Sequence, residues 1–191
     1  MKIEIHHDPY AGSPREWDNL GILICSHRKY DLSDVPFPQA GENGSLLADF
    51  KAYLKSQSLT INDVIYTPVY MYDHSGIALS STPFGCRWDS GQIGFNYTTK
   101  QKVRTEYSVK RISPKLNQII IDNLNTELAV YSDYVEGNCY GFVITDSDDN
   151  HVDSCWGFYG GLDNVKQQMR GYIVSDLWEQ LDAIDYDDVV Y

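Results

Sequence analysis

The chain has 191 residues, of which 42% are hydrophobic and 22% charged, and its formal net charge is −12. A chain of this length and composition can bury roughly 70% of its unfolded surface around one core, which excludes a wholly disordered protein. No run reaches the roughly 18 apolar residues of a membrane span, so a membrane-spanning helix is not expected.

The negative charge is distributed unevenly. Residues 116–191 hold 15 Asp and Glu against only Lys166 and Arg170, whereas residues 1–115 hold 13 Lys and Arg against 12 Asp and Glu. An acidic surface repels phosphate backbones and attracts basic ones. The sequence therefore predicts a basic protein partner and disfavours direct binding of nucleic acid. A smaller basic cluster, suited to an acidic partner or to a solvated helix, comprises Lys100, Lys102, Arg104, Lys110, Arg111 and Lys115.

The N-terminus and the cysteines indicate a cytoplasmic protein. The opening stretch MKIEIHHDPY carries charge where a signal peptide has its apolar core. The four cysteines form no C-x-x-C pair, so we expect buried thiols and neither a zinc ribbon nor a redox motif. They are Cys25, Cys86, Cys139 and Cys155.

The first third of the chain predicts strands around one helix. Residues 2–7 alternate as a strand does, and the apolar run at 20–27 suits a buried strand. Residues 45–57 place apolar side chains on one helical face, with Ser45 as the N-cap. The aromatic and β-branched run that follows is a strand in which Pro68 predicts an edge or a bulge.

The remainder predicts two strands, a short helix at 100–107, a long helix, a hairpin and a final helix. The long helix has Ser113 as its cap, Pro114 in its first turn and Gly137 at its end. Residues 139–161 have the pattern of a hairpin, and residues after 161 that of the final helix. We therefore predict one α+β domain over residues 1–191, with a mainly antiparallel sheet, about three helices and an acidic C-terminal helix and tail at about 162–191.

Residues 69–97, VYMYDHSGIALSSTPFGCRWDSGQIGFNY, are dense in reactive side chains. Their glycines and the Asp89–Ser90 pair suit tight turns, so most of this chemistry is interpreted as turn chemistry. Arg87 and Trp88 remain candidates for a partner-binding surface, because Arg and Trp are common binding anchors.

Two enzymatic interpretations stay open. One is a divalent metal held where the N-terminal strand lies beside the strand ending at Tyr72, since imidazole and carboxylate are common ligands. Its ligands would come from His6, His7, Asp8, His27, Asp73 and His74. The other is a thiol nucleophile at Cys139 or Cys155, with His74 or His151 as base, although both cysteines fall inside predicted strands. We assign no catalytic residue, metal or cofactor.

The acids of the final helix recur every three residues, so that they follow one side of it. Either this is a solvated helix face, or it is a stripe that mimics DNA phosphates and binds a basic groove, with tyrosines and a tryptophan adding apolar contact area. The predicted partner-binding acids are Asp176, Glu179, Asp182, Asp185, Asp187 and Asp188.

Three segments carry a family resemblance: DNLGILICSHRKYDL, YMYDHSGIALSSTPFGCRWDSGQIGF and DSCWGFYG. Together they resemble a family of small acidic proteins of bacteriophages and other mobile elements, without an assigned function. The resemblance spans residues 3 to about 160, so the acidic C-terminal helix lies outside it. It implies a mobile-element origin, and accessory proteins of that origin often inhibit host restriction enzymes or CRISPR nucleases. It transfers no catalytic residues.

Three hypotheses follow. The first is an inhibitor that binds a host defence nuclease, or another basic nucleic-acid-binding protein, in the host cytoplasm through its acidic surface, and partly through Arg87 and Trp88. The second is a small metal-dependent or cysteine hydrolase. The third is a phage structural or assembly protein. The third predicts a stable homo-oligomer and no host partner, and a homodimer is the candidate form.

Overall fold

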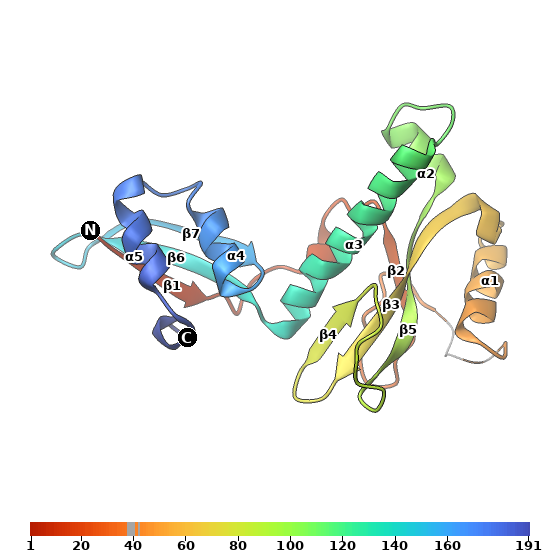
Figure 1. Ribbon diagram of the computed structural model, residues 1–191, viewed down its shortest axis with the longest axis horizontal. Helices are drawn as coiled ribbons and strands as arrows, with labels where there is room; N and C mark the ends of the chain where they lie inside the picture. The colour runs from red at the N-terminus through yellow and green to blue at the C-terminus, as the bar shows by residue number, and fades with distance from the viewer. Residues whose placement is uncertain (38–40, 42) are drawn as a thin grey trace. The chain divides into compact units, whose positions relative to one another are not determined.

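The computed structural model describes residues 1–37, 41 and 43–191, which form two compact units (Figure 1). Unit 1 comprises residues 1–14 and 133–191, and unit 2 comprises residues 15–132. Each unit has an antiparallel sheet and its own buried core, so the chain has the predicted α+β class. The single domain over residues 1–191 stays a prediction.

The sheet of unit 2 has four strands in the order β2-β5-β3-β4, and every neighbouring pair is antiparallel. The strands are β2 (Ile22–Cys25), β3 (Val64–Asp73), β4 (Ile77–Ser80) and β5 (Ser90–Thr99). Pro68 pairs with Phe95, and the ladder shifts register between Val69 and Tyr70, where Ile93 of β5 is the extra residue. A bulge thus lies close to Pro68, and Pro68 also lies at an edge, because β4 pairs only with Tyr70–Asp73 of β3.

Helices cover both faces of this sheet. Helix α1 (Leu46–Ser56) packs on one face, where the Phe50 ring stacks on Phe95 with 4.4 Å between centroids. Successive residues of a strand point to opposite faces. The next residue of β5, Asn96, accordingly donates its amide to the Leu124 carbonyl of α3 at 2.9 Å. Helices α2 (Lys100–Glu106) and α3 (Pro114–Glu136) share the core on that second face.

The predicted helix ends are confirmed. Ser45 Oγ accepts from the Ala48 amide at 3.2 Å, and Ser113 Oγ accepts from the Leu116 amide at the same distance. Gly137 ends α3 with a φ of 82°, and the Asn138 amide donates back to the Asp133 carbonyl at 2.8 Å. This backbone favours glycine, because a side chain is strained at such a φ.

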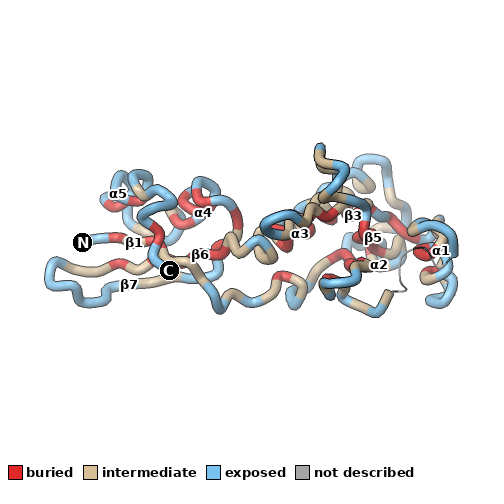
Figure 2. Tube along the Cα trace, turned by 90° about the horizontal axis from the view of Figure 1, so that it is seen from below, coloured by how far each residue is buried: buried red, intermediate tan, exposed pale blue. Residues whose placement is uncertain are grey.

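Unit 1 contains a three-stranded sheet in the order β1-β6-β7. Its strands are β1 (Lys2–His7), β6 (Cys139–Thr145) and β7 (His151–Tyr159). The end of the chain continues the sheet, since the Val190 amide donates to the Ile5 carbonyl at 2.9 Å. Helices α4 (Leu162–Met169) and α5 (Trp178–Ala183) bury their apolar sides against one face of the sheet, whereas β7 at the edge stays mostly exposed (Figure 2).

The predicted final helix at 162–184 is wrong, because it is broken into α4, the 3-10 helix η3 (Ser175–Leu177) and α5. Apolar residues recur every three or four positions throughout this segment, which is why its pattern resembles one helix. Gly171 and the β-branched Ile173–Val174 pair weaken a helix at the break. Turning there lets Met169 and Leu181 enter the same core, where both are 0% exposed.

Five α-helices occur in the described residues, against about three predicted. None of those helices is long and apolar enough to cross a membrane. The remaining short 3-10 helices are η1 (Pro14–Glu16), η2 (Ile61–Asp63) and η4 (Tyr186–Asp188).

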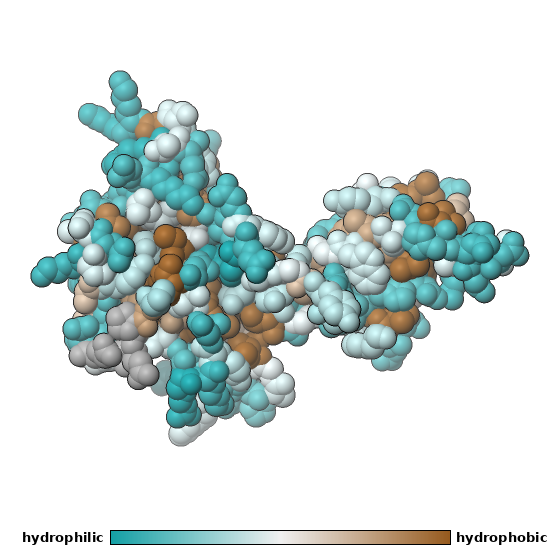
Figure 3. All heavy atoms as spheres, turned by 180° about the vertical axis from the view of Figure 1, so that it is seen from behind, coloured by the Kyte–Doolittle hydropathy of each residue, from teal (hydrophilic) through white to brown (hydrophobic). Residues whose placement is uncertain are grey.

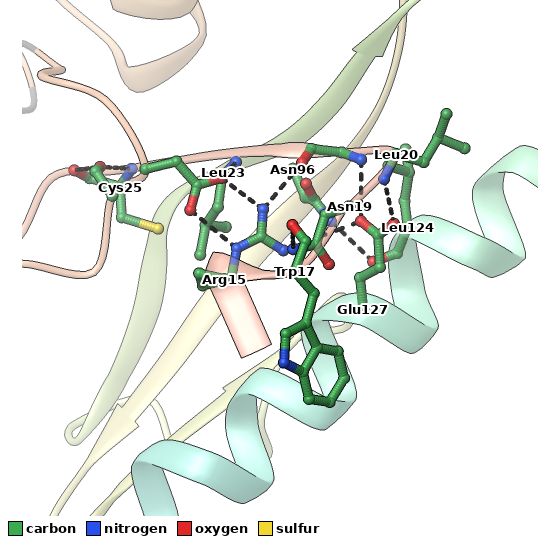
Figure 4. A network of polar contacts seen from close by, with 12 residues as sticks. Arg15, Trp17, Asn19, Leu20, Leu23, Cys25, Asn96, Leu124 and Glu127 are labelled. Carbon is green, nitrogen blue, oxygen red and sulfur yellow. Dashed lines mark hydrogen bonds and ion pairs between the residues drawn. The ribbon is translucent and has the colours of Figure 1, made fainter. Parts of the chain in front are cut away.

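A polar network centred on Arg15 joins three segments of unit 2 (Figure 4). The Arg15 guanidinium pairs with Asp34, with 2.9 Å from Nε to Oδ1, and donates to the Gly21 carbonyl. Glu127 of α3 accepts from the Leu20 amide at 2.6 Å and from the Gly21 amide at 3.0 Å. The segment leading into β2 is therefore fixed to α3 through charged groups that are largely buried.

Replacing Arg15 by Met should strongly destabilise the protein. The change leaves the Asp34 and Glu127 carboxylates largely buried without their cation, which costs about 3–5 kcal/mol. Chemical denaturation of Arg15→Met and of the exposed control Lys51→Met measures the free energy of unfolding. A loss below about 1 kcal/mol for Arg15→Met, or an equal loss for the control, would contradict this role of the network.

Candidate functional site

Unit 1 carries the whole net charge of the chain. It contains 15 Asp and Glu against Lys2, Lys166 and Arg170, a net of −12. Unit 2 contains 12 acidic and 12 basic residues, a net of zero. The gradient along the sequence thus becomes a division between two structural units.

Most acids of unit 1 lie at the surface without a cation. Besides Glu136, ten carboxylates of the unit are exposed, and among them only Asp182 forms an ion pair within the described residues, with Arg170. The ten are Asp148, Asp149, Asp153, Asp163, Asp176, Glu179, Asp182, Asp185, Asp187 and Asp188. Exposed carboxylates without a paired cation give the surrounding surface a negative electrostatic potential.

The predicted acidic stripe does not follow one helix. Asp176 lies in η3, Glu179 and Asp182 in α5, and the remaining acids at η4. Because α5 ends at Ala183, the helical spacing on which the stripe was predicted does not continue to Asp185, Asp187 and Asp188. The acids still share the segment 175–188, which packs on the sheet of unit 1 through Leu177 and Leu181.

The six predicted acids differ in their local contacts. Asp188 accepts from the Asp185 amide at 2.9 Å in a capping box, and Asp182 pairs with Arg170. The side chains of Asp176, Glu179 and Asp187 make no hydrogen bond or ion pair with another described residue. These three are therefore the carboxylates whose replacement disturbs the unit least.

Aromatic rings lie near these acids in the sequence and are partly exposed. Tyr172 packs edge-on against Phe158 and is 63% exposed, and the Arg170 guanidinium lies 5.3 Å from the Trp178 ring centroid. On the visible surface of unit 1, hydrophilic residues are interrupted by paler and apolar ones (Figure 3). The surface therefore offers flat contact area as well as charge.

Arg87 and Trp88 lie in the loop between β4 and β5 of unit 2. Trp88 is 96% exposed, and Arg87 is exposed beside it. The loop base is held by turn contacts, with Cys86 Sγ 3.4 Å from Asp89 Oδ2 and the Asp89 carbonyl accepting from the Asp73 amide at 2.8 Å. The structure agrees with the interpretation of this stretch as turn chemistry, and Arg87 and Trp88 are exposed in the loop.

A pocket of about 350 Å³ lies under this loop, between residues 27–29 and residues 88–91. Asp73 enters it and accepts from Lys29 Nζ at 3.2 Å and from the Tyr30 hydroxyl at 3.3 Å. The hydrogen bond from Lys29 is the main cause that lowers the pKa of Asp73. This carboxylate is therefore ionised and already paired.

The premise of the metal hypothesis is wrong. Strand β1 pairs with β6, so it does not lie beside the strand that ends at Tyr72. His6, His7 and Asp8 belong to unit 1, whereas His27, Asp73 and His74 belong to unit 2. No group of three His, Cys, Asp or Glu within the described residues could hold a metal ion.

Cys139 and Cys155 lie inside strands as predicted, but the expectation of four buried thiols is wrong, because Cys86 and Cys155 are partly exposed. Cys139 in β6 is 3% exposed, and burial raises the pKa of its thiol to about 11. Cys155 in β7 is half-buried and packs against the core of unit 1. His151 Nε2 lies 3.1 Å from Ser154 Oγ, so its polar contact is with a serine. This geometry does not build a thiol nucleophile with its base.

Comparison with known proteins adds no relative. A scan against models of protein families found no match to the chain, and searches of curated proteins and of solved structures found none either. The resemblance to mobile-element proteins stays a prediction.

Two features of the surface were not foreseen from the sequence. One is the neutrality of unit 2, because the boundary between the units at residues 132 and 133 lies inside a helix and has no local signal. The other is that four members of the basic cluster line one pocket. Their clustering in the sequence was visible, but the chain reversal that brings them together required the structure.

Alkylation of the native protein should separate the four thiols into two pairs. Burial raises the pKa of Cys25 to about 12 and that of Cys139 to about 11, so both should resist iodoacetamide at about pH 8. Cys86 and Cys155 are more accessible and should react first. Peptide mass spectrometry over time measures this order. Rapid modification of native Cys139 would restore the cysteine hydrolase as a serious alternative.

Proposed function

We propose that this chain is a binding protein whose unit 1 docks on the basic nucleic-acid-binding surface of another protein and excludes nucleic acid from it. The observation that carries the proposal is the concentration of a net charge of −12 on unit 1, with nine of its exposed acids lacking a cation. A host defence nuclease, either a CRISPR nuclease or a restriction enzyme, is the proposed partner class.

The physical basis is competition for the same cations. Duplex DNA presents one charge per roughly 1.7 Å of its axis, and its partners collect Lys and Arg to match that density. A compact acidic unit placed in the same groove satisfies those cations without being a substrate. Complementary charge also accelerates encounter, by about 10- to 1,000-fold.

The exposed aromatic rings near the acids add apolar contact area, which charge alone does not provide. Tyr172, Trp178 and Tyr186 are exposed and carry flat apolar surface. Aromatic residues are enriched among the anchors of protein interfaces, where they fill pockets that exclude water. Arg87 and Trp88 of unit 2 are proposed as a second contact on the same grounds.

One observation favours the assembly alternative. Strand β7 is the edge of the unit 1 sheet and is mostly exposed along its nine residues. An exposed edge presents unpaired amides and carbonyls that a second copy can pair with. Under this alternative, β7 strands of two copies pair and the protein forms a homodimer.

Competition with DNA tests the proposed function. We expect the wild-type protein to displace a fluorescent duplex from at least one member of a purified panel of RNA-guided nucleases and restriction enzymes. A unit 1 triple variant, Asp176→Lys, Glu179→Lys and Asp187→Lys, should slow association at least about tenfold, because it removes steering charge. Fluorescence anisotropy and stopped-flow mixing measure both quantities.

The matched control changes the same charge on unit 2. Glu16→Lys, Asp18→Lys and Asp31→Lys replace three exposed acids whose side chains make no hydrogen bond or ion pair with another described residue. They change the net charge by the same amount as the unit 1 triple variant does. This unit 2 triple variant should behave like wild type. If no enzyme releases DNA, or if both triple variants weaken binding equally, the acidic unit is not a nucleic-acid mimic.

A further inference from the structure

Unit 2 contains a pocket of about 580 Å³ that is lined by cations. It lies between α2, the loop after it and the start of α3. Lys100, Arg104, Lys110 and Arg111 contribute side chains to the lining, together with Ser113 and Asn117. None of the described residues that line it carries a carboxylate. The pocket therefore holds four positive charges within a unit whose net charge is zero.

A chain reversal after α2 builds the pocket. Ser108 adopts a φ of 50°, the Val109 amide donates to the Arg104 carbonyl at 3.0 Å, and the Ser108 amide donates to the Thr105 carbonyl at 3.2 Å. This pair of bonds is a Schellman motif, with serine at the position that glycine usually takes. It turns the chain back so that Lys110 and Arg111 face the pocket to which Arg104 contributes.

The pocket rests on a packed base. Ile112 and Leu116 pack against the core formed by Val103 of α2 and Ile120 of α3. Lys100 Nζ donates to the Asn62 carbonyl at 2.7 Å, which fixes one of the cations. The end of unit 2 that carries α2 and the following loop bears long hydrophilic side chains at the surface (Figure 3). The cations thus project from a base that does not depend on a ligand to form.

The cations of the pocket lack acidic partners. Arg104, Lys110 and Arg111 are exposed and form no ion pair with another described residue. Asp63 lies outside the lining, and its pKa is lowered mainly by hydrogen bonds from Thr60 and further by the charges of Lys100 and Arg104. Lys100 and Arg104 thus lie within electrostatic reach of one carboxylate, whereas Lys110 and Arg111 face the pocket without an ion pair to a described residue.

We propose that this pocket binds phosphate groups, either of a free phosphate compound or of a nucleic-acid strand. Guanidinium groups bind phosphate oxygens through paired, charge-assisted hydrogen bonds. The N-terminal turn of the 23-residue helix α3 adds partial positive charge at Ser113 and Asn117. A pocket of this volume accommodates a nucleotide-sized ligand. The site lies wholly in unit 2 and goes beyond the proposed function.

Direct binding to the full chain tests the proposal with two probes, inorganic pyrophosphate by calorimetry and a labelled oligothymidylate of about 12 nucleotides by anisotropy. Salt of about 0.15 M limits repulsion from unit 1 to about 8 Å. Arg104→Ala with Arg111→Ala should weaken binding by roughly tenfold or more. The control Lys51→Ala with Lys55→Ala removes two exposed cations of the same unit and should stay within about twofold of wild type.

The outcomes separate the two sources of phosphate. Binding of pyrophosphate alone indicates a free phosphate compound. Binding of the oligonucleotide, with a slope of log affinity against log salt near −3 for four cations, indicates a strand. The proposal is overturned if neither probe binds, if both double variants bind alike, or if polyglutamate of matched charge binds as tightly as the phosphate probes. None of these results depends on a protein partner, so they are independent of the proposed function.

Discussion

Pairing of β1 with β6 is the constraint on which the organisation of this protein depends. The two strands pair antiparallel over six positions although more than 130 residues separate them, and all of unit 2 lies in the intervening chain. Residues 133–191 alone carry a net charge of −11, and residues 1–14 add −1. The pairing therefore joins β1 to the sheet of the acidic unit and leaves a neutral unit in the intervening chain.

The acidic unit must fold against its own repulsion. Its core combines Ile5 of β1 with Phe142 of β6 and Met169 of α4, all 0% exposed, so apolar burial opposes the electrostatic cost. The exposed carboxylates remain hydrated, which keeps that cost small. A partner that supplies cations relieves the repulsion, so binding is linked to the stability of this unit in particular. One chain thus carries an acidic surface on unit 1, which attracts cations, and a basic pocket on unit 2, which attracts anions.

Local sequence signals predicted the elements well where one residue decides the backbone. Ser45, Ser113 and Gly137 mark helix ends because each satisfies orphan helix groups, and Pro68, which lacks an amide, lies where β3 pairs with β5 alone. The prediction of one continuous acidic helix was wrong because the apolar spacing continues through Ile173, whereas Gly171 and the β-branched Ile173–Val174 pair interrupt the helical backbone. The charges of the candidate site were visible in the sequence as one acidic C-terminal region, but the addition of β1 to that unit depends on a long-range pairing that no local pattern encodes.

Retention of partners from a bacterial lysate, followed by elution with duplex DNA, tests the central claim most directly. Tagged wild type, the unit 1 triple variant and the unit 2 triple variant are compared at about 0.1 M salt, with mass spectrometry of the eluates. The account predicts that DNA releases nucleic-acid enzymes from wild type and from the unit 2 variant, and that the unit 1 variant retains few of them. Proteins that stay bound in the presence of DNA, or that bind the unit 1 variant equally, would contradict it.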